Sequence, residues 1–227
     1  HTQLKQLKTE VKEIAVKDCI PPYVSFKTEK LQGWLQEIKQ KILPVKTIKD
    51  ADGVKKIIDK DSLKQTVVIN GKSYSFGIGG FHSKDSPAYY KTDKFSTIID
   101  LDATSYYPSI IINLGLHPSH LTSLWTDNFR EITKERVKAK KEGENLKAEA
   151  MKIIINSSFG KSGSPYSFMF DPKLMITVTL TGQLSIMMLI EELESAGIEV
   201  ISANTDGITC KVSHEKRAKF EFLRGQW

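Results

Sequence analysis

One stretch of the sequence, residues 95–116, constrains the fold more than any other. Its first part, FSTIIDLDA, is rich in β-branched residues and alternates with a period of two, which predicts a strand with Asp100 and Asp102 on one face. Pro108 cannot donate to a β-ladder but suits the first turn of a helix, which Gly115 would close. The stretch therefore predicts a strand, a sharp turn and a helix, with Asp102 at the end of the strand.

Asp102 has two interpretations from this stretch alone. A carboxylate where a strand meets a turn is well placed to hold a divalent metal ion. The simpler interpretation is that Asp102 only caps the helix that follows.

Composition is that of a globular protein and decides little about function. With 227 residues the chain can bury a core as one large domain or two small ones. A net charge of +6 is compatible with a polyanionic partner and equally with an ordinary surface. Cys19 and Cys210 form no C-x-x-C pair, which argues against a zinc site or a disulfide framework and favours a reducing compartment.

Targeting signals are not found in the sequence. No apolar run approaches the length of a membrane span and no signal-peptide pattern opens the chain. We therefore expect no membrane partner and a cytoplasmic, non-secreted protein. Because the chain begins at His1 without an initiator Met, we expect it to be part of a longer protein.

The first third of the chain predicts helices and then a hairpin. Apolar residues at helical spacing predict helices over residues 1–16 and 29–43. Residues 44–66 have mixed character and predict a solvated connecting region. Two β-like runs follow, separated by Asn70-Gly71, which predicts a β-hairpin.

The rest of the chain predicts a helical hairpin, a long helix and a second β-hairpin. Helices are expected over residues 127–141 and 146–159, separated by a break at Gly143. A long helix is expected from Pro172, and a hairpin over residues 198–212 carries Asp206 near its tip. An Asp-Gly pair in a hairpin is usually only a turn. His82 and His117 have no partner at metal-ligand spacing and are interpreted as structural.

Three segments resemble the motifs of family B (replicative, α-like) DNA polymerases. DATSYYPS, which begins at Asp102, resembles D-x-x-S-L-Y-P-S, and KIIINSSFG, which begins at Lys152, resembles the finger-helix motif K-x-x-x-N-S-x-Y-G. Asn204-Thr205-Asp206 lies where the Y-x-D-T-D-S hairpin is expected. The resemblance covers about residues 95–212 in the family's order. The preceding FGIGGFHS is similar to phage-type members, and if the source is a virus we expect the protein in the host cytoplasm.

The resemblance implies a metal site and its ligands. Asp102 and Asp206 would bind two Mg²⁺ ions, with Mn²⁺ as an alternative, and the Ala103 carbonyl would complete a site. Asp100 is a rival to Asp102 because it lies on the same strand face. Only Asp102, however, has the offset to Ser105 that the motif requires.

The resemblance also implies a nucleotide site. Arg136, Lys140 and Lys152 would contact the triphosphate, with Asn156 one turn from Lys152 on the same helix. The backbone N–H near Ser105 would contact a phosphate, and Tyr107 would exclude a 2′-hydroxyl. The alternative for each of the three cations is a solvated helix face, and the alternative for Tyr107 is core packing.

Several positions depart from the family pattern, which leaves the activity of the chain open. The metal hairpin reads S-A-N-T-D-G, and its second aspartate, which carries the metals in the family, is present. The departures are Ser202 for Tyr, Asn204 for Asp, Gly207 for Ser, Phe159 for Tyr and Ala148 where Gln is common.

The resemblance implies an α+β fold: a polymerase palm, formed by an antiparallel sheet backed by helices, with a helical-hairpin fingers subdomain. The expected segments are N-terminal helices and a hairpin in residues 1–80, palm in 81–124, fingers in 125–160 and palm in 161–227.

The implied function is template-directed DNA synthesis from dNTPs on a primer–template. The partners would be this DNA and the exonuclease and thumb regions of a longer polymerase. The alternatives are another two-metal nucleotidyltransferase, such as a reverse transcriptase or primase, and a non-catalytic nucleic-acid-binding fragment.

Overall fold

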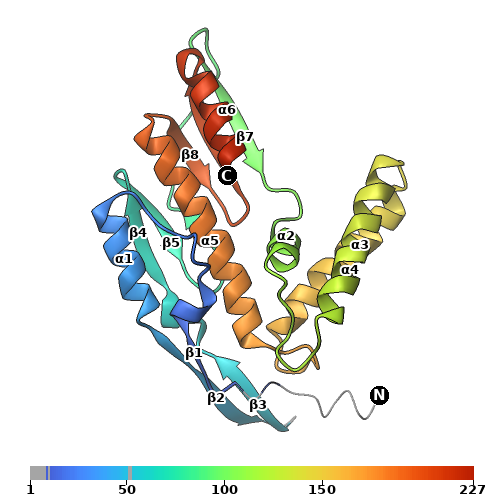
Figure 1. Ribbon diagram of the computed structural model, residues 1–227. Helices are drawn as coiled ribbons and strands as arrows, with labels where there is room; N and C mark the ends of the chain where they lie inside the picture. Colours follow the sequence, from blue (N-terminus) through green and yellow to red (C-terminus); the bar gives the residue numbers. More distant parts are fainter. Residues whose placement is uncertain (1–8, 10, 51–52) are drawn as a thin grey trace. The chain divides into compact units, whose positions relative to one another are not determined.

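The computed structural model describes residue 9 and residues 11–50 and 53–227. Within these residues it combines helices with three small antiparallel sheets, ordered β1-β2-β3, β4-β5-β6 and β7-β9-β8 (Figure 1). The expected mixture of helices and antiparallel sheets is thereby confirmed, whereas the palm and fingers assignments stay predictions.

The chain forms two compact units, which are described one at a time. The first contains His1–Cys19, Ile42–Asp59 and Ser105–Val178, and the second contains Ile20–Lys41, Lys60–Thr104 and Thr179–Trp227. The four segments expected from the sequence, which assign palm and fingers, stay predictions.

The sheet of the first unit corrects two predictions. Its strands are β1 (Glu13–Ala15), β2 (Ile42–Asp50) and β3 (Gly53–Ile58), and a short 3₁₀ helix, Val16–Cys19, follows β1. The helix predicted over residues 1–16 is therefore wrong for Glu13–Ala15, while residues 1–8 and 10 lie outside the described residues. The solvated connection predicted over 44–66 is also wrong, because β2 and β3 form a hairpin there.

Tertiary pairing explains the first correction. Ile14 lies opposite Leu43 across the β1–β2 pair, and Ile14, Val16 and Leu43 are all buried. The apolar spacing that suggested a helix therefore also satisfies a strand whose partner comes from later in the chain.

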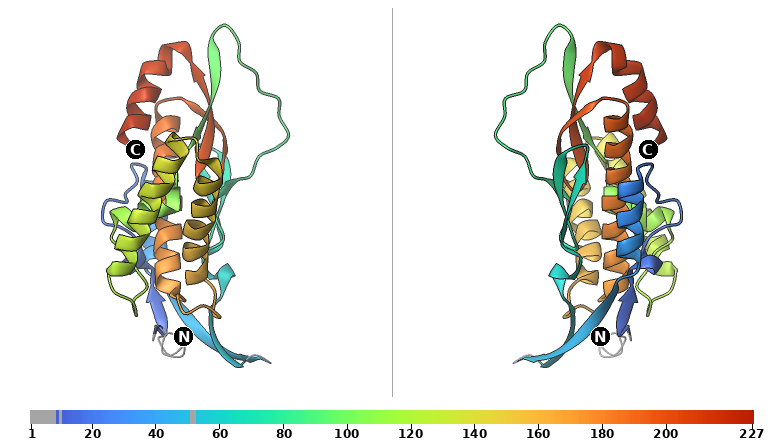
Figure 2. Two further views of the ribbon diagram at one scale, coloured as in Figure 1. Left: turned by 90° about the vertical axis from the view of Figure 1, so that its right-hand side faces the viewer. Right: turned by 90° about the vertical axis from the view of Figure 1, so that its left-hand side faces the viewer.

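The helices of the first unit pack around one apolar core. They are α2 (Tyr106–Asn113), α3 (Leu124–Lys141), α4 (Asn145–Ser162) and the start of α5 (Pro172–Ser195). Helices α3 and α4 run side by side as the predicted helical hairpin, and Gly143 has φ +78° in the turn between them (Figures 1 and 2). The core consists of Ile110, Ile111, Phe129, Ile155, Leu174 and Val178.

The second unit contains the predicted Asn70-Gly71 hairpin. Strands β4 (Gln65–Ile69) and β5 (Lys72–Phe76) pair through this turn, and short β6 (His82–Ser83) adds to β5. Both turn residues have positive φ, which confirms the prediction. A 3₁₀ turn, Lys60–Leu63, precedes β4.

Helix α1 (Glu29–Lys39) buries Leu31, Leu35 and Ile38 in the second unit. The Trp34 ring meets the Phe76 ring of β5 edge-on, with centroids 5.0 Å apart. The predicted helix is confirmed, although it ends before Ile42, where β2 begins.

The third sheet carries the two candidate metal ligands. It consists of β7 (Ser96–Asp102), β8 (Glu199–Ala203) and central β9 (Gly207–Ser213), and it is followed by a 3₁₀ turn, His214–Lys216, and α6 (Arg217–Gln226). Every second residue of β9 is buried, namely Ile208, Cys210 and Val212. The opposite face of the sheet therefore carries the polar residues.

Helix α5 corrects the expectation that no stretch approaches the length of a membrane span. Among the described residues it is the one helix long and apolar enough to cross a bilayer. However, 78% of its most apolar stretch is buried inside the protein, as in the core helix of a globular fold.

Candidate functional site

Asp102 and Asp206 lie next to each other in the second unit although they are far apart in sequence. Asp102, the last residue of β7, pairs with Gly207, the first residue of β9. The Ala103 N–H donates to the Asp206 carbonyl over 2.9 Å, which extends the ladder by one bond. Since paired Cα atoms lie roughly 5 Å apart and consecutive ones 3.8 Å, the two aspartate Cα atoms are within about 9 Å.

The carboxylates on this sheet differ in how they are engaged. The Thr209 hydroxyl donates to the Asp100 carboxylate over 2.8 Å. Asp102 and Asp206 are exposed, and no described residue hydrogen-bonds or ion-pairs with either carboxylate. The two predicted ligands are thus free to bind a cation, whereas Asp100 already has a partner within the sheet.

Asn204 builds the turn that positions Asp206. Its side-chain oxygen accepts hydrogen bonds from the N–H groups of Asp206, at 3.1 Å, and Gly207, at 2.7 Å. Its own N–H donates to the Gly207 carbonyl over 2.9 Å. This arrangement is an Asx-type turn. Asn204 therefore has a structural function at the position where the family pattern has an aspartate.

Gly207 allows β7 and β9 to approach closely. A Cβ at this position would lie 2.7 Å from the Leu101 carbonyl oxygen and 3.5 Å from an Asp102 carboxylate oxygen. The first distance is shorter than side chains tolerate, so glycine here follows from the packing of the hairpin against β7.

The glycine-rich segment that precedes Phe81 lies against the same turn. A Cβ on Gly80, which has φ +141°, would be 2.9 Å from the Thr205 hydroxyl. The Gln183 side chain of α5 accepts from the Gly77 N–H at 3.3 Å and donates to its carbonyl at 2.7 Å. Helix α5 therefore anchors the loop that supports the turn bearing Asp206.

In the first unit, Ser105 and Arg136 meet although they are 31 residues apart in sequence. Ser105 precedes α2 with the left-handed backbone angles φ 53° and ψ 46°. Its hydroxyl accepts a hydrogen bond from the Arg136 guanidinium of α3 over 2.5 Å. The Arg136 Nε–H is buried and has no acceptor in the part of the chain that the structure describes.

Tyr107 packs against a residue of the second helix of the hairpin. Its ring lies 4.9 Å from the Phe159 ring of α4, at 58°. Helical spacing places Lys152, Asn156 and Phe159 along one side of α4. The side that carries two predicted nucleotide contacts is thus the side that reaches Tyr107.

The remaining predicted cations are exposed. Lys152 pairs with Glu149 at 3.6 Å, and its side chain is 48% exposed. Lys140 lies in the last turn of α3, where a cation also stabilises the helix end. Neither lysine hydrogen-bonds with Ser105 or Arg136 among the described residues, so their predicted roles depend on the resemblance.

Comparison with known proteins finds a distant relative. No protein-family model matches the chain. Over 152 residues the chain is 28% identical to DNA polymerase II of Escherichia coli (strain K12), a match that covers 56% of this chain and 19% of that protein. The chain is similar to a DNA polymerase. It spans about a fifth of the length of the curated relative that it matches.

A solved structure also matches with low similarity. It is the family B DNA polymerase from the hyperthermophilic archaeon Pyrobaculum calidifontis, with a TM-score of 0.45 and 14% identity. That match covers 63% of this chain and 26% of the archaeal chain.

The donor set at Asp102 and Asp206 fits Mg²⁺ better than a closed structural metal site. Across residues 11–50 and 53–227, no three His, Cys, Asp or Glu side chains form a cluster that could hold a metal ion. Mg²⁺ needs few protein ligands, because it retains water and binds substrate phosphates. A structural Zn²⁺ site needs four ligands, and Cys19 and Cys210 are free and buried.

Sequence reasoning missed three supporting residues. Asn204 had a readable signal, because Asn-x-Asp-Gly is typical of an Asx turn. The contact of Phe159 with Tyr107 and the close approach at Gly207 had none, since each depends on a partner distant in sequence.

Proposed function

We propose that this chain is the palm and fingers part of a template-directed family B DNA polymerase. The single observation that carries the proposal is the adjacency of Asp102 and Asp206, two carboxylates without partners among the described residues. The ordered motifs and the similarity to DNA polymerase II support it.

Asp102 and Asp206 would hold two Mg²⁺ ions, or Mn²⁺, together with the Ala103 carbonyl. When bound, such ions stabilise the attacking and leaving oxygens of an in-line displacement. The chain itself supplies the rigid support: the Asn204 turn and the Ala103 N–H fix the backbone of Asp206.

By the resemblance, the phosphates of the incoming dNTP would meet the cations of α3 and α4. Only Ala103 and Thr104 separate Asp102 from Ser105 in sequence. A triphosphate oxygen would accept a hydrogen bond from the buried Nε–H of Arg136. Without such an acceptor, this buried donor destabilises the protein. Lys140, Lys152 and Asn156 would add contacts to the phosphates, and Tyr107 would lie beneath the sugar.

In the proposed reaction the primer 3′-hydroxyl attacks the α-phosphorus of the dNTP. A new phosphodiester bond forms, the bond to the β-phosphate breaks, and pyrophosphate leaves. Template pairing would select the base, because phosphate contacts do not read sequence. The partners would be primer–template DNA and the exonuclease and thumb regions of a longer cytoplasmic polymerase, of viral origin by its motifs.

Primer extension and metal binding test the proposal together. Asp206→Asn should lower Mg²⁺-dependent extension by at least about 100-fold, because it removes a charged metal ligand. Asp100→Asn is the matched control, since Thr209 already engages Asp100, and it should change extension little.

Mn²⁺ binding to the 227-residue chain, followed by electron paramagnetic resonance, gives a readout that does not need activity. It should weaken in Asp206→Asn and not in Asp100→Asn. Equal effects of the two variants would overturn the assignment of the hairpin. Extension on RNA templates, or without a primer, would favour a reverse transcriptase or a primase.

A further inference from the structure

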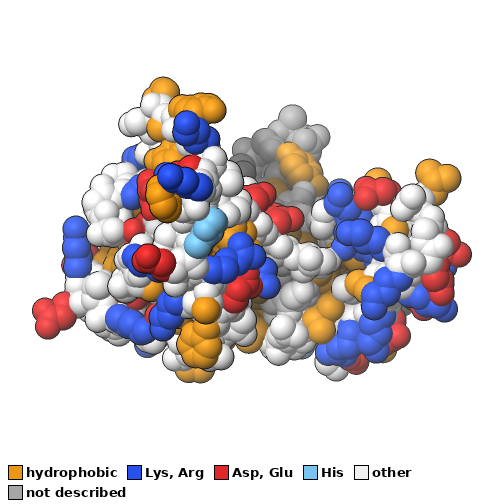
Figure 3. Space-filling view, turned by 90° about the horizontal axis from the view of Figure 1, so that it is seen from above, with side chains coloured by type: hydrophobic (Ala, Val, Ile, Leu, Met, Phe, Trp, Pro, Cys, Tyr) orange, Lys and Arg blue, Asp and Glu red, His pale blue; other side chains and the backbone are white. Residues whose placement is uncertain are grey.

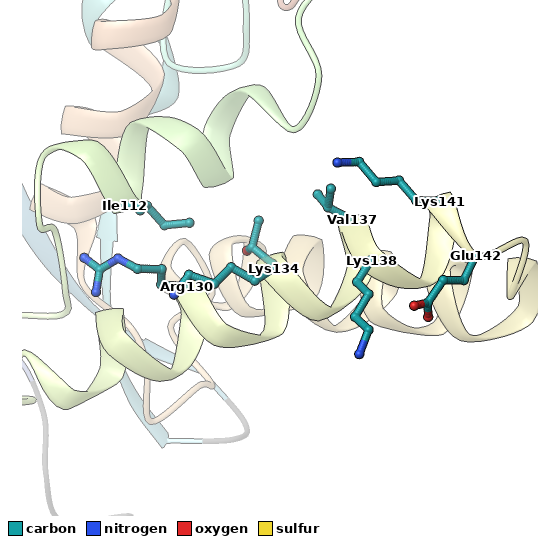
Figure 4. A pocket seen from close by; sticks show the side chains of 8 residues that line it. Ile112, Arg130, Lys134, Val137, Lys138, Lys141 and Glu142 are labelled. Atoms are coloured by element: carbon teal, nitrogen blue, oxygen red, sulfur yellow. The ribbon is translucent and has the colours of Figure 1, made fainter.

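A second row of cations runs along α3, on a side away from Arg136 and Lys140. At about 100° per residue, this row is centred about a third of a turn from Lys140 and farther from Arg136. Figure 4 shows Arg130 toward one end of the row and Lys141 toward the other. The row consists of Arg130, Lys134, Lys138 and Lys141, which are spaced at four, four and three residues.

This basic row borders a groove between α3 and α2. The groove encloses about 620 Å³ and is lined by the four cations together with Ile112, Thr133, Val137 and Glu142. Ile112 comes from α2, Glu142 caps the C-terminus of α3, and the other labelled side chains in Figure 4 come from α3. Ile112 and Val137 give the groove an apolar surface, and Val137 is 39% exposed.

The charge of the groove is poorly neutralised by the protein. Lys138 and Lys141 form no ion pair with any described residue. Arg130 pairs with Asp127 at 2.6 Å and Lys134 with Glu131 at 2.8 Å, both as i,i+3 pairs with partly exposed side chains. Such surface pairs contribute little and release their cations readily to a stronger anion.

The length of the basic row suits an elongated ligand. From Arg130 to Lys141 the helix rises by about 16 Å, at 1.5 Å per residue. Seen from above, lysine and arginine side chains gather over the helical hairpin (Figure 3). A row of cations beside an apolar surface matches a chain of phosphates with attached sugars and bases.

We propose that this groove binds a single strand of nucleic acid. The phosphates lie on the cations, while sugars or unpaired bases cover Ile112 and Val137. A duplex offers mainly phosphates to a protein surface, so it would leave the apolar part of the groove uncovered. The proposal rests on the proposed function, because a polymerase must hold the unpaired template strand.

Fluorescence anisotropy of the 227-residue chain with a labelled single-stranded oligonucleotide tests the proposal. The double variant Lys138→Ala/Lys141→Ala should bind about twenty-fold more weakly near 0.1 M salt, because each lost single-strand phosphate contact lowers the salt slope by about 0.7. The matched control, Lys147→Ala/Lys161→Ala, removes the same charge from the α4 side of the hairpin and should bind nearly as the unmodified chain does.

Two results would overturn the proposal. One is equal weakening in both double variants, which would mean that only net charge matters. The other is equal or tighter binding of a duplex of the same sequence, which would exclude the single-strand occupant. Because the measurement contains no metal ion and no dNTP, its failure leaves the polymerase proposal standing. Asp206→Asn should change primer extension without changing this binding.

Discussion

Arg136 donates a hydrogen bond to the hydroxyl of Ser105, and Ser105 holds a left-handed backbone conformation that side-chain-bearing residues rarely adopt. The bond joins the helical hairpin of α3 and α4 to the turn that begins α2. The resemblance implies a phosphate contact both for Arg136 and for the backbone near Ser105. Strained backbone beside an arginine with a free N–H is an arrangement often found at ligand sites.

Arg136→Ala should weaken nucleotide use more than DNA binding. A hydrogen bond to a charged group contributes about 1.5–3 kcal/mol, so kcat/KM for the dNTP should fall roughly 10- to 150-fold. Single-nucleotide incorporation at a series of dNTP concentrations measures this. Lys147→Ala serves as the control, because Lys147 pairs with Glu144 at the far end of the hairpin. Unchanged dNTP dependence in Arg136→Ala would exclude this role.

Gly207→Ala should separate β9 from β7. Its Cβ would lie 2.7 Å from the Leu101 carbonyl, so the hairpin must shift and the chain should lose about 1–3 kcal/mol of unfolding free energy. Gly33→Ala in α1 meets nothing within 4 Å and should instead stabilise the chain by about 0.5–1 kcal/mol. Urea denaturation measures the change in unfolding free energy, which should be negative for Gly207→Ala and positive for Gly33→Ala. Destabilisation by Gly33→Ala would contradict this prediction.

Tyr107→Ala should raise the use of ribonucleotides relative to deoxyribonucleotides, because it removes the ring expected beneath the sugar. Phe159→Ala should shift the ratio in the same direction by a smaller factor, since its ring supports Tyr107 from 4.9 Å away. Competition between dCTP and CTP in primer extension gives the ratio. If Tyr107 serves only packing, both variants should lose stability without changing the ratio.

The acid stability of the second unit should depend on Asp85. Burial raises the pKa of Asp85, but hydrogen bonds from Ser83, Lys72 and Ser202 outweigh it, so the pKa lies below its usual 3.8. Lys72 pairs with Asp85 at 3.1 Å and also donates to the Val200 and Ile201 carbonyls on the edge of β8. The network therefore links β5 and β8.

Because the pKa of Asp85 is lower in the folded state, the ionised Asp85 adds to the free energy of unfolding above pH 3.8. This stabilisation is lost as the pH falls through the pKa of the folded state. Unfolding free energies from urea titrations on both sides of pH 3.8 should show this loss. Asp85→Asn should flatten the dependence in that range. An identical pH dependence in the variant would show that other carboxylates dominate.

Local signals were sufficient where neighbouring residues decide the backbone. The Asn70-Gly71 turn, Pro108 in the first turn of α2 and Gly115 just after α2 all behave as predicted, because their conformations depend on their own φ preferences. The helix prediction was wrong at Glu13–Ala15 for the opposite reason. Its identity depends on pairing with β2, about 30 residues later in the chain, and spacing alone does not distinguish it from a helix.

The sequence by itself determined the order of the motifs, the elements of the helical hairpin and the two aspartates worth considering. Only the tertiary structure decided that Asp102 lies beside Asp206, that Thr209 engages Asp100, and that Arg136 meets Ser105. The physical reason is the distance along the sequence over which each interaction acts. Turn and helix preferences act over a few residues, whereas a strand register or a helix–helix contact joins residues that are far apart in sequence.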